Sequence, residues 1–382
     1  MVFNMSIHFR YIRFNVGKKK STTINNNGKY NKLHKNNKNS KRIVLIIVAA
    51  VALIVTAGTI VGVMTSSTTD NNNISTSSQN IVGDWMDIHG IGIIPTGMNN
   101  DSLYVATHNG LFKKTDNNNN NSSQWIQVGN DKSDLMGFVI NPDSQEKMYS
   151  SGHPQTGGNL GFRISDDYGQ TWQKVSDVTT PTPIDIHTMT TGNNPEIIYA
   201  ASGMGDNIFI STDEGKNWTI TSPPGGQQVI TLATNQSNSN NVYSATTGGL
   251  FSSIDQGKNW QKINNELISG NDTMVTGIEI SSDGKTAYAF AVPNSAGQSN
   301  SGYIIKSKDG GETWSKTDGQ ITGAIFVSKF AFGNNGEVYV AVTQDSTETD
   351  VASSVFSSKD DGKTWALEGT NNNKLLERTL VH

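Results

Sequence analysis

The 382-residue chain contains no cysteine, and this absence excludes disulfide bonds as a source of stability. Arginine is also scarce, because only Arg163 and Arg378 remain beyond residue 64. We find no Ser–His–Asp arrangement, no phosphate-cradling glycine loop and no cofactor fingerprint. Stability must therefore come from a hydrophobic core, and the common nucleophile and nucleotide chemistries are not indicated.

The first 64 residues lack acidic side chains but carry eleven Lys or Arg residues. Residues 43–64 form an uncharged apolar run that is long enough, at about 1.5 Å per residue, to cross a bilayer core. The run is too long for a typical signal peptide and predicts an uncleaved transmembrane signal anchor, with membrane lipid as its partner. Residues 1–42 would then be a basic, disordered cytoplasmic segment, with the rest of the chain outside the cell.

Without that segment the charge balance changes. Residues 65–382 hold 18 basic and 33 acidic side chains, a formal charge of −15. Such a surface repels polyanions, so we expect no nucleic-acid partner. A linker rich in Ser, Thr and Asn (65–80) precedes the folded part, which we expect over 81–370, followed by a tail at 371–382.

One phrase, Ser-x-Asp-x-Gly-x-Thr/Asn-Trp, recurs five times, and its aspartates are 46, 42, 54 and 51 residues apart. This is the period of a four-stranded propeller blade. Asp accepts hydrogen bonds from backbone N–H groups, and Gly adopts conformations closed to other residues, so the phrase predicts a tight turn. The Trp that follows should pack between neighbouring blades. The five structural aspartates are Asp167, Asp213, Asp255, Asp309 and Asp360.

The phrase resembles the Asp-box, or BNR, repeat of sialidase-like, sortilin-like and photosystem-assembly-factor propellers. The resemblance covers about residues 85–370 and implies an architecture rather than a function. Other stretches are similar to a microbial propeller family often labelled glycosyl hydrolase, a label that itself rests on fold similarity. These stretches are Asp87–Gly92, Leu103–Phe112, and Asp134–Phe138 followed by Ser151–Pro154.

Counting four strands per repeat predicts an all-β fold, a six-bladed β-propeller, with seven blades as the alternative. The first blade is expected at residues 90–94, 103–107, 111–114 and 125–128. The first strands of the other blades should begin near Gly137, Thr188, Val229, Thr276 and Ser328. Residues 81–86 are expected to add an outer strand that helps to close the ring. Asp-box turns join the third and fourth strands and therefore lie on one face of the ring. Ligand sites in propellers usually lie on the other face, around the mouth of the central channel, so we expect ligands there.

Four histidines fall at two repeat positions on that opposite face, and all belong to the first three units. His89 and His187 lie at the start of the first strand, where the second unit has Met136. His108 and His153 lie at the end of the second strand. We therefore expect these five side chains to line a ligand-binding site at the mouth of the central channel.

Later units differ at the end of the second strand, where they carry Thr247, Val292 and Thr343. In unit three, Met204 is near this position but one residue out of register. Neutral imidazole is a common ligand for zinc and copper, and an added thioether would favour copper. Three interpretations remain open: a copper or zinc site formed by the four histidines, a site for another ligand, and histidines that only cap strand ends.

Aspartates provide an enzymatic alternative. Asp87, Asp134 and Asp185 recur at one position of the first three units, and a glycoside hydrolase for neutral sugars needs only two carboxylates about 5–9.5 Å apart. The same aspartates would also serve as turn caps. Sialidase chemistry, which the resemblance brings to mind, uses three arginines and cannot be built here.

These patterns predict a membrane-anchored extracellular propeller with a non-catalytic role. Its partner would be an extracellular glycan, a small ligand or a protein bound at the histidine-lined face. A glycoside hydrolase other than a sialidase is the alternative.

Overall fold

The computed structural model describes residues 85–95, 101–117, 122–179, 183–268, 273–293, 301–345 and 351–372. The expected cytoplasmic segment 1–42, the anchor 43–64, the linker 65–80 and most of the tail 371–382 lie outside these ranges. Among the described residues, no helix has the length and apolar character needed to span a bilayer.

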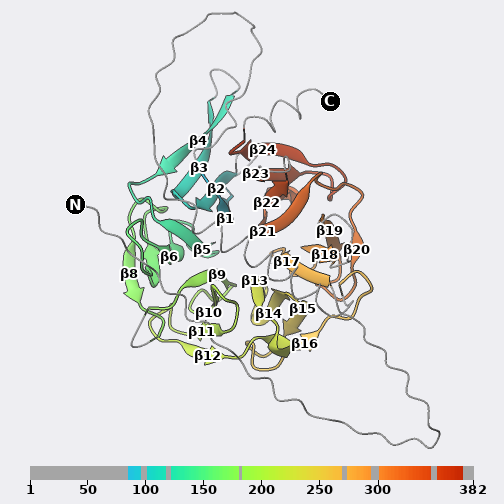
Figure 1. Cartoon of the computed structure of the whole chain (residues 1–382), viewed down its shortest axis with the longest axis horizontal. Helices are drawn as coiled ribbons and strands as arrows, with labels where there is room; N and C mark the ends of the chain where they lie inside the picture. Colours follow the sequence, from blue (N-terminus) through green and yellow to red (C-terminus); the bar gives the residue numbers. More distant parts are fainter. Residues whose placement is uncertain are drawn as a thin grey trace, which may run out of the picture. The chain divides into compact units, whose positions relative to one another are not determined.

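The described residues form six antiparallel sheets, each built from four strands that follow one another in the chain (Figure 1). The first three blades are β1 (Ile88–Ile94), β2 (Ser102–Thr107), β3 (Gly110–Asn117), β4 (Ser122–Val128); β5 (Asp134–Ile140), β6 (Met148–His153), β7 (Phe162–Ser165), β8 (Gln173–Ser176); and β9 (Ile186–Thr191), β10 (Ile198–Ser202), β11 (Ile208–Ser211), β12 (Thr219–Thr221). The other three are β13 (Val229–Asn235), β14 (Asn238–Thr246), β15 (Gly249–Ser253), β16 (Gln261–Lys262); β17 (Thr273–Ile280), β18 (Ala287–Pro293), β19 (Tyr303–Ser307), β20 (Ser315–Lys316); and β21 (Ala324–Phe332), β22 (Val338–Asp345), β23 (Val351–Ser358), β24 (Ala366–Thr370).

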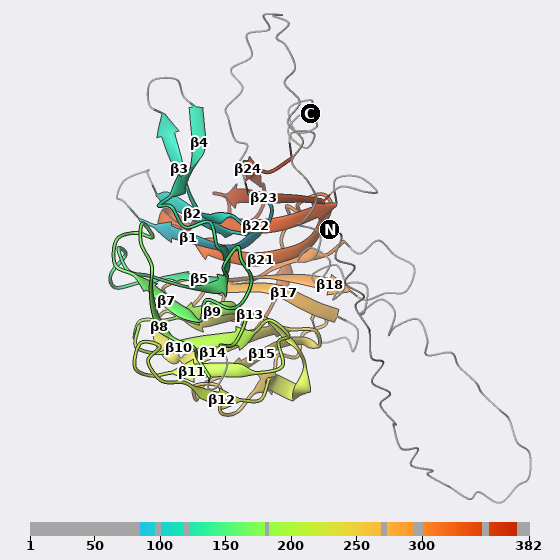
Figure 2. The same ribbon diagram turned by 60° about the vertical axis from the view of Figure 1, so that its left-hand side comes forward.

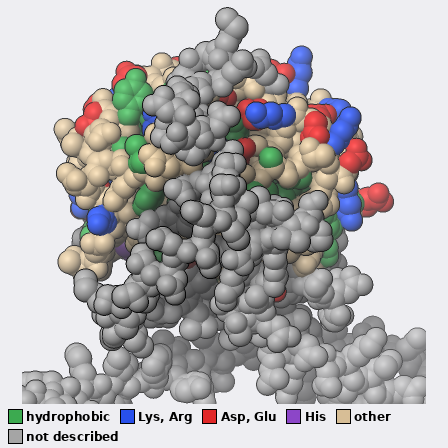
Figure 3. Space-filling view, turned by 90° about the horizontal axis from the view of Figure 1, so that it is seen from above, with side chains coloured by type: hydrophobic (Ala, Val, Ile, Leu, Met, Phe, Trp, Pro, Cys, Tyr) green, Lys and Arg blue, Asp and Glu red, His purple; other side chains and the backbone are tan. Residues whose placement is uncertain are grey.

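The six blades form a closed ring, which confirms the six-bladed prediction over seven. The first strands β1, β5, β9, β13, β17 and β21 surround the centre, and each contacts the first strands of its neighbours (Figure 1). In five blades this strand begins two to four residues earlier than expected, because pairing continues past a β-bulge. The hairpin of β3 and β4 extends beyond the rest of its blade in Figure 2. The face in Figure 3 carries both acidic and basic side chains among uncharged ones.

Apolar side chains between neighbouring blades form the core. One of these clusters joins blades five and six through the buried Tyr288, Phe290, Val327 and Phe330. Similar clusters occupy the other junctions, because each sheet has side chains on both faces and each face meets another blade.

The ring is closed by contacts between two complete blades. The Trp85 indole is 3% exposed and donates to the carbonyl of Ser353 (3.2 Å), whose hydroxyl accepts the backbone N–H of Ile88 (2.9 Å). Asp101 accepts two hydrogen bonds from Asn334, at 2.8 and 2.6 Å. The outer strand expected at 81–86 is wrong for the described Trp85 and Met86, which form no strand. A side-chain anchor at Trp85 takes its place.

The repeated phrase folds as a tight turn, as its residues predicted. Asp167 accepts the N–H of Thr171 at 2.9 Å, and Ser165 donates to the same carboxylate oxygen at 2.7 Å. The Ser165 hydroxyl in turn accepts the N–H of Gly169, whose φ is +82°. The same Ser–Asp–Gly pattern holds at the turns containing Asp213, Asp255, Asp309 and Asp360.

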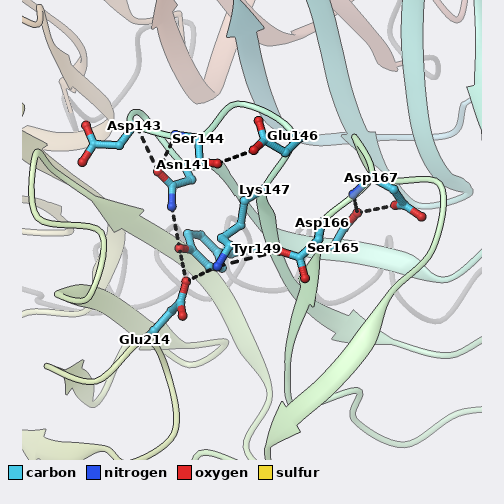
Figure 4. Close-up of polar contacts among 10 residues, drawn as sticks. All are labelled: Asn141, Asp143, Ser144, Glu146, Lys147, Tyr149, Ser165, Asp166, Asp167 and Glu214. Carbon is cyan, nitrogen blue, oxygen red and sulfur yellow. Dashed lines mark hydrogen bonds and ion pairs between the residues drawn. The ribbon is translucent and has the colours of Figure 1, made fainter.

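Asp-box turns also connect neighbouring blades. Trp218 lies 5.3 Å from the ring of Phe162 in the preceding blade, in an edge-to-face contact. Glu214, in the same turn, accepts hydrogen bonds from Lys147 (2.7 Å) and Tyr149 (3.1 Å) of blade two (Figure 4). The repeat therefore fixes both the hairpin and the junction, on the face opposite the histidines.

Candidate functional site

Three positions recur at one end of every blade, where the first and second strands pair. We call them the rim positions: the head position, its cross-strand partner (the end position), and an unpaired bulge position two residues after the head. In blade order the head positions are Asp87, Asp134, Asp185, Gln228, Met274 and Phe326. The bulge positions are His89, Met136, His187, Ile230, Thr276 and Ser328. The end positions are His108, His153, Gly203, Thr247, Val292 and Thr343.

A β-bulge in the first strand of blades one and three sets the direction of the histidine side chain. Pairing shifts between Ile88 and Gly90 in blade one, which leaves His89 without a cross-strand partner. The equivalent shift in blade three leaves out His187. A bulge bends the strand and redirects the extra side chain, so both imidazoles turn toward the rim.

The first cluster consists of His89, His108 and Asp134. The Nε2 atom of His89 lies 3.2 Å from one carboxylate oxygen of Asp134, and Nδ1 of His108 lies 3.0 Å from the other. The two rings have centroids 6.3 Å apart. Since Asp134 belongs to blade two and both histidines to blade one, this cluster spans a blade junction.

The second cluster consists of His153, Asp185 and His187. One oxygen of Asp185 lies 3.0 Å from Nε2 of His153 and 2.9 Å from Nε2 of His187. His153 uses its other ring nitrogen, Nδ1, to contact the carbonyl oxygen of Gly158 at 2.9 Å. This cluster spans the junction of blades two and three.

Both clusters use the same pairing rule. The end-position histidine of one blade contacts the head-position aspartate of the next: His108 with Asp134, and His153 with Asp185. Asp134 and His153 are themselves cross-strand partners on β5 and β6, so the two clusters are adjacent. The series ends at the next junction, where Gly203 and Gln228 take the corresponding positions.

Electrostatics favours charged forms in both clusters. Burial alone would raise the pKa of Asp134, but the His108 hydrogen bond and the approach of His89 outweigh it and hold that pKa well below its ordinary value. The pKa of Asp185 is likewise low, since His153 and His187 outweigh its burial. Asp185 raises the pKa of His153 to about 9. The contacts between histidine and aspartate therefore stabilise the ionised carboxylates of both clusters and the protonated form of His153.

Several contacting atoms are nevertheless unsatisfied. Within the two clusters, four buried atoms lack any hydrogen bond of acceptable geometry: Nε2 of His89 and His187, and one carboxylate oxygen each of Asp134 and Asp185. Each nitrogen lies within 3.2 Å of its carboxylate oxygen, yet the pair is not aligned for donation.

Met204 is one residue out of register, as the sequence indicated. Gly203 takes the end position of blade three, and Met204 is 63% exposed. A Cβ atom at Gly203 would lie 2.7 Å from both a carboxylate oxygen of Asp185 and Nε2 of His187. Sequence reasoning missed this glycine because only strand register identifies the position.

The remaining candidates belong to other positions of the same rim. Met136, at the bulge position of blade two, is buried, with 7% of its surface exposed. Burial raises the pKa of Asp87, and its backbone carbonyl accepts the N–H of His108 at 3.1 Å. Arg163 is buried and paired with Asp131 at 2.7 Å, so it is not free to hold a substrate carboxylate.

Comparison with known proteins supports the fold and its repeat type. The sortilin (neurotensin receptor 3, Vps10) family profile matches residues 161–267 and 206–328. The chain thus resembles sortilin-like BNR propellers and, in structure, glycosyl hydrolase propellers. No curated protein sequence matches the chain closely enough to count as a relative.

Solved structures with this fold include two GH74 proteins. The GH74 enzyme of Niastella koreensis is 17% identical with a TM-score of 0.51, over 76% of this chain and 47% of that one. The GH74 xyloglucanase of Xanthomonas campestris is 12% identical with a TM-score of 0.51, over 76% and 46%. YCF48 bound to D1 peptide is 14% identical with a TM-score of 0.41, over 74% and 83%. This chain therefore spans less than half the length of these GH74 proteins.

Proposed function

We propose that this propeller is a non-catalytic binding module whose ligand contacts the rim of blades one to three. The supporting observation is the difference between blades that share one backbone. All six have a head, a bulge and an end position, but only the first three place His or Asp there. Blades four to six show that the fold does not require these groups.

The free-energy cost of burying the ionisable groups of both clusters supports the same conclusion. The Asp134 side chain is 10% exposed, and those of His89 and His187 are 19% and 20% exposed. Removing ionisable groups from water costs free energy unless they are well paired, and four atoms here are not hydrogen-bonded. A group retained at a cost without a structural need is a functional candidate.

We further propose that the apolar run 43–64 anchors the protein in the membrane and that the propeller lies outside the cell. The ligand would then be an extracellular glycan, small molecule or protein. This proposal depends on the sequence of residues 1–64 and on the formal charge of −15 beyond them.

Ligand binding is tested with the purified full chain against panels of glycans and peptides. Replacing His108 and His153 together with Ala should weaken binding at least about tenfold, the loss of roughly 1.4 kcal/mol of contact. The matched control replaces Thr247 and Thr343, at the same position of blades four and six, and should bind normally. Equal binding by both variants would refute a ligand site at this rim.

One observation favours a second candidate, a glycoside hydrolase. Burial raises the pKa of Asp87, whereas the neighbouring Asp134 is held ionised by two imidazoles. Two carboxyls with pKa values moved in opposite directions are what an acid and a base require. Turnover of a neutral glycan that falls about 10²–10⁴-fold in Asp87→Asn would establish this alternative.

A further inference from the structure

We infer that each cluster binds one zinc ion, so that the rim of blades one to three presents two adjacent metal centres to the ligand. The ligands of the first ion would be His89, His108 and Asp134, and those of the second His153, His187 and Asp185. The inference deepens the proposed binding function and rests on it for the ligand, whereas metal binding itself is measured separately.

The spacing of the donor atoms fits a small cation. In each cluster the three ligand atoms lie within 4.8 Å of one another. Zinc binds imidazole nitrogen and carboxylate oxygen at about 2.0–2.2 Å, so two ligands of a tetrahedral ion lie about 3.3 Å apart. The nitrogen-to-oxygen distances of 2.9 to 3.2 Å are close to this value.

The unaligned atoms provide the second argument. Nε2 of His89 faces an oxygen of Asp134, and Nε2 of His187 faces an oxygen of Asp185, yet neither pair forms a hydrogen bond of acceptable geometry. Buried polar atoms in native proteins are normally satisfied. A cation placed between nitrogen and oxygen would use the lone pairs of both, which accounts for the close approach without donation.

The surroundings of the second cluster are those of a metal site. The Nδ1 atom of His153 contacts the carbonyl of Gly158 at 2.9 Å, which orients the ring and directs Nε2 toward Asp185. Metal-binding histidines commonly use the second nitrogen in this way. Gly203 leaves the space beside Asp185 and His187 free of a Cβ atom.

The chemistry of the donors favours zinc. Each cluster supplies two imidazoles and one carboxylate, the three-ligand set of zinc sites that keep a fourth position open. The chain has no cysteine, and each three-ligand set consists of nitrogen and oxygen donors, whereas Cu(I) prefers soft sulfur ligands. The open positions would be taken by water or by the ligand.

The experiment is a zinc titration of the metal-free full chain, with stoichiometry measured by elemental analysis after buffer exchange. We expect two equivalents for the wild type, one for Asp134→Ala, one for Asp185→Ala, and none for the double variant. Gln228→Ala, which changes the head position of blade four, is the matched control and should retain two. Circular dichroism and the unfolding temperature verify that each variant is folded.

Should an Asp variant fail to fold, His108→Gln and His153→Gln test the same two clusters, because these histidines occupy the end positions of blades one and two. X-ray absorption at the zinc edge should show nitrogen and oxygen neighbours only. No tightly bound zinc in the wild type, a single equivalent, two equivalents in the double variant, or a sulfur neighbour would each overturn the assignment. If the ligand still binds after the zinc is removed by a chelator, the proposed binding function stands, and only the role of the metals in ligand binding is refuted.

Discussion

Replacing Gly203 with Ala should remove the second metal centre and leave the first intact. The added Cβ would lie 2.7 Å from a carboxylate oxygen of Asp185 and 2.7 Å from Nε2 of His187. Both atoms must move by several tenths of an ångström, and overpacking of this kind costs about 1–3 kcal/mol. Because zinc ligands hold their distances within about 0.2 Å, a shift of that size is enough to lower affinity at least about tenfold.

The assay compares zinc stoichiometry and unfolding temperature for the wild type and Gly203→Ala, each with and without a chelator. The variant should bind one equivalent and gain less stability from zinc than the wild type. Gly248→Ala is the control, because the three atoms nearest to its Cβ would all belong to the flexible side chain of Gln227 and not to a cluster residue. Two equivalents bound to Gly203→Ala with wild-type affinity would refute the reasoning about both the glycine and the cluster.

Three further predictions concern the scaffold. Hydrogen bonds from Asn217 and Thr313 lower the pKa of Asp213 and Asp309, respectively, to about 2. The two carboxylates should therefore contribute fully to stability above pH 4, and this contribution should be lost as the pH falls toward 2. Urea unfolding at a series of pH values measures the loss. Trp85→Ala should destabilise the ring by about 3–5 kcal/mol by calorimetry, because the indole is buried at the closing junction. Lys329→Met should cost about 3–5 kcal/mol in chemical unfolding, since it leaves the buried carboxylate of Glu279 without its cation 3.4 Å away.

Each scaffold prediction has a result that would contradict it. Stability that is unchanged between pH 4 and pH 2 would show that the Asp-box carboxylates do not hold these turns. Trp85→Ala unfolding like the wild type would mean that other contacts close the ring. If Lys329→Met is as stable as the wild type, then Glu279 must be protonated in the fold, as the raised pKa caused by its burial would allow.

The sequence was sufficient to predict the blades because each one repeats the same local signal. Asp-box turns depend on residues within eight positions of one another, such as Ser165, Asp167 and Gly169, and local geometry can be read from local sequence. The strand starts were less accurate, because a β-bulge continues pairing through residues that look like a loop.

The candidate site was only partly predictable for a related reason. The repeat positions predicted that the four histidines lie on one face of the ring. They did not predict the division into two clusters, because that division depends on contacts across blade junctions. Asp134 and Asp185 appeared as turn caps or acids, and the structure instead places each beside two imidazoles. The role of Gly203 is set by strand register and space, neither of which leaves a sequence signal.

The way in which the ring closes has a mechanical consequence. The polypeptide itself crosses five of the six blade junctions, and the sixth, between blades one and six, is held by side chains such as Trp85 and Asp101. Asn371 bonds to the carbonyl of Met86, so the two ends of the propeller leave it side by side. Tension applied to either end therefore acts first on this seam. A circular permutant that joins these ends and is cut between two other blades would move this seam to another junction of the ring.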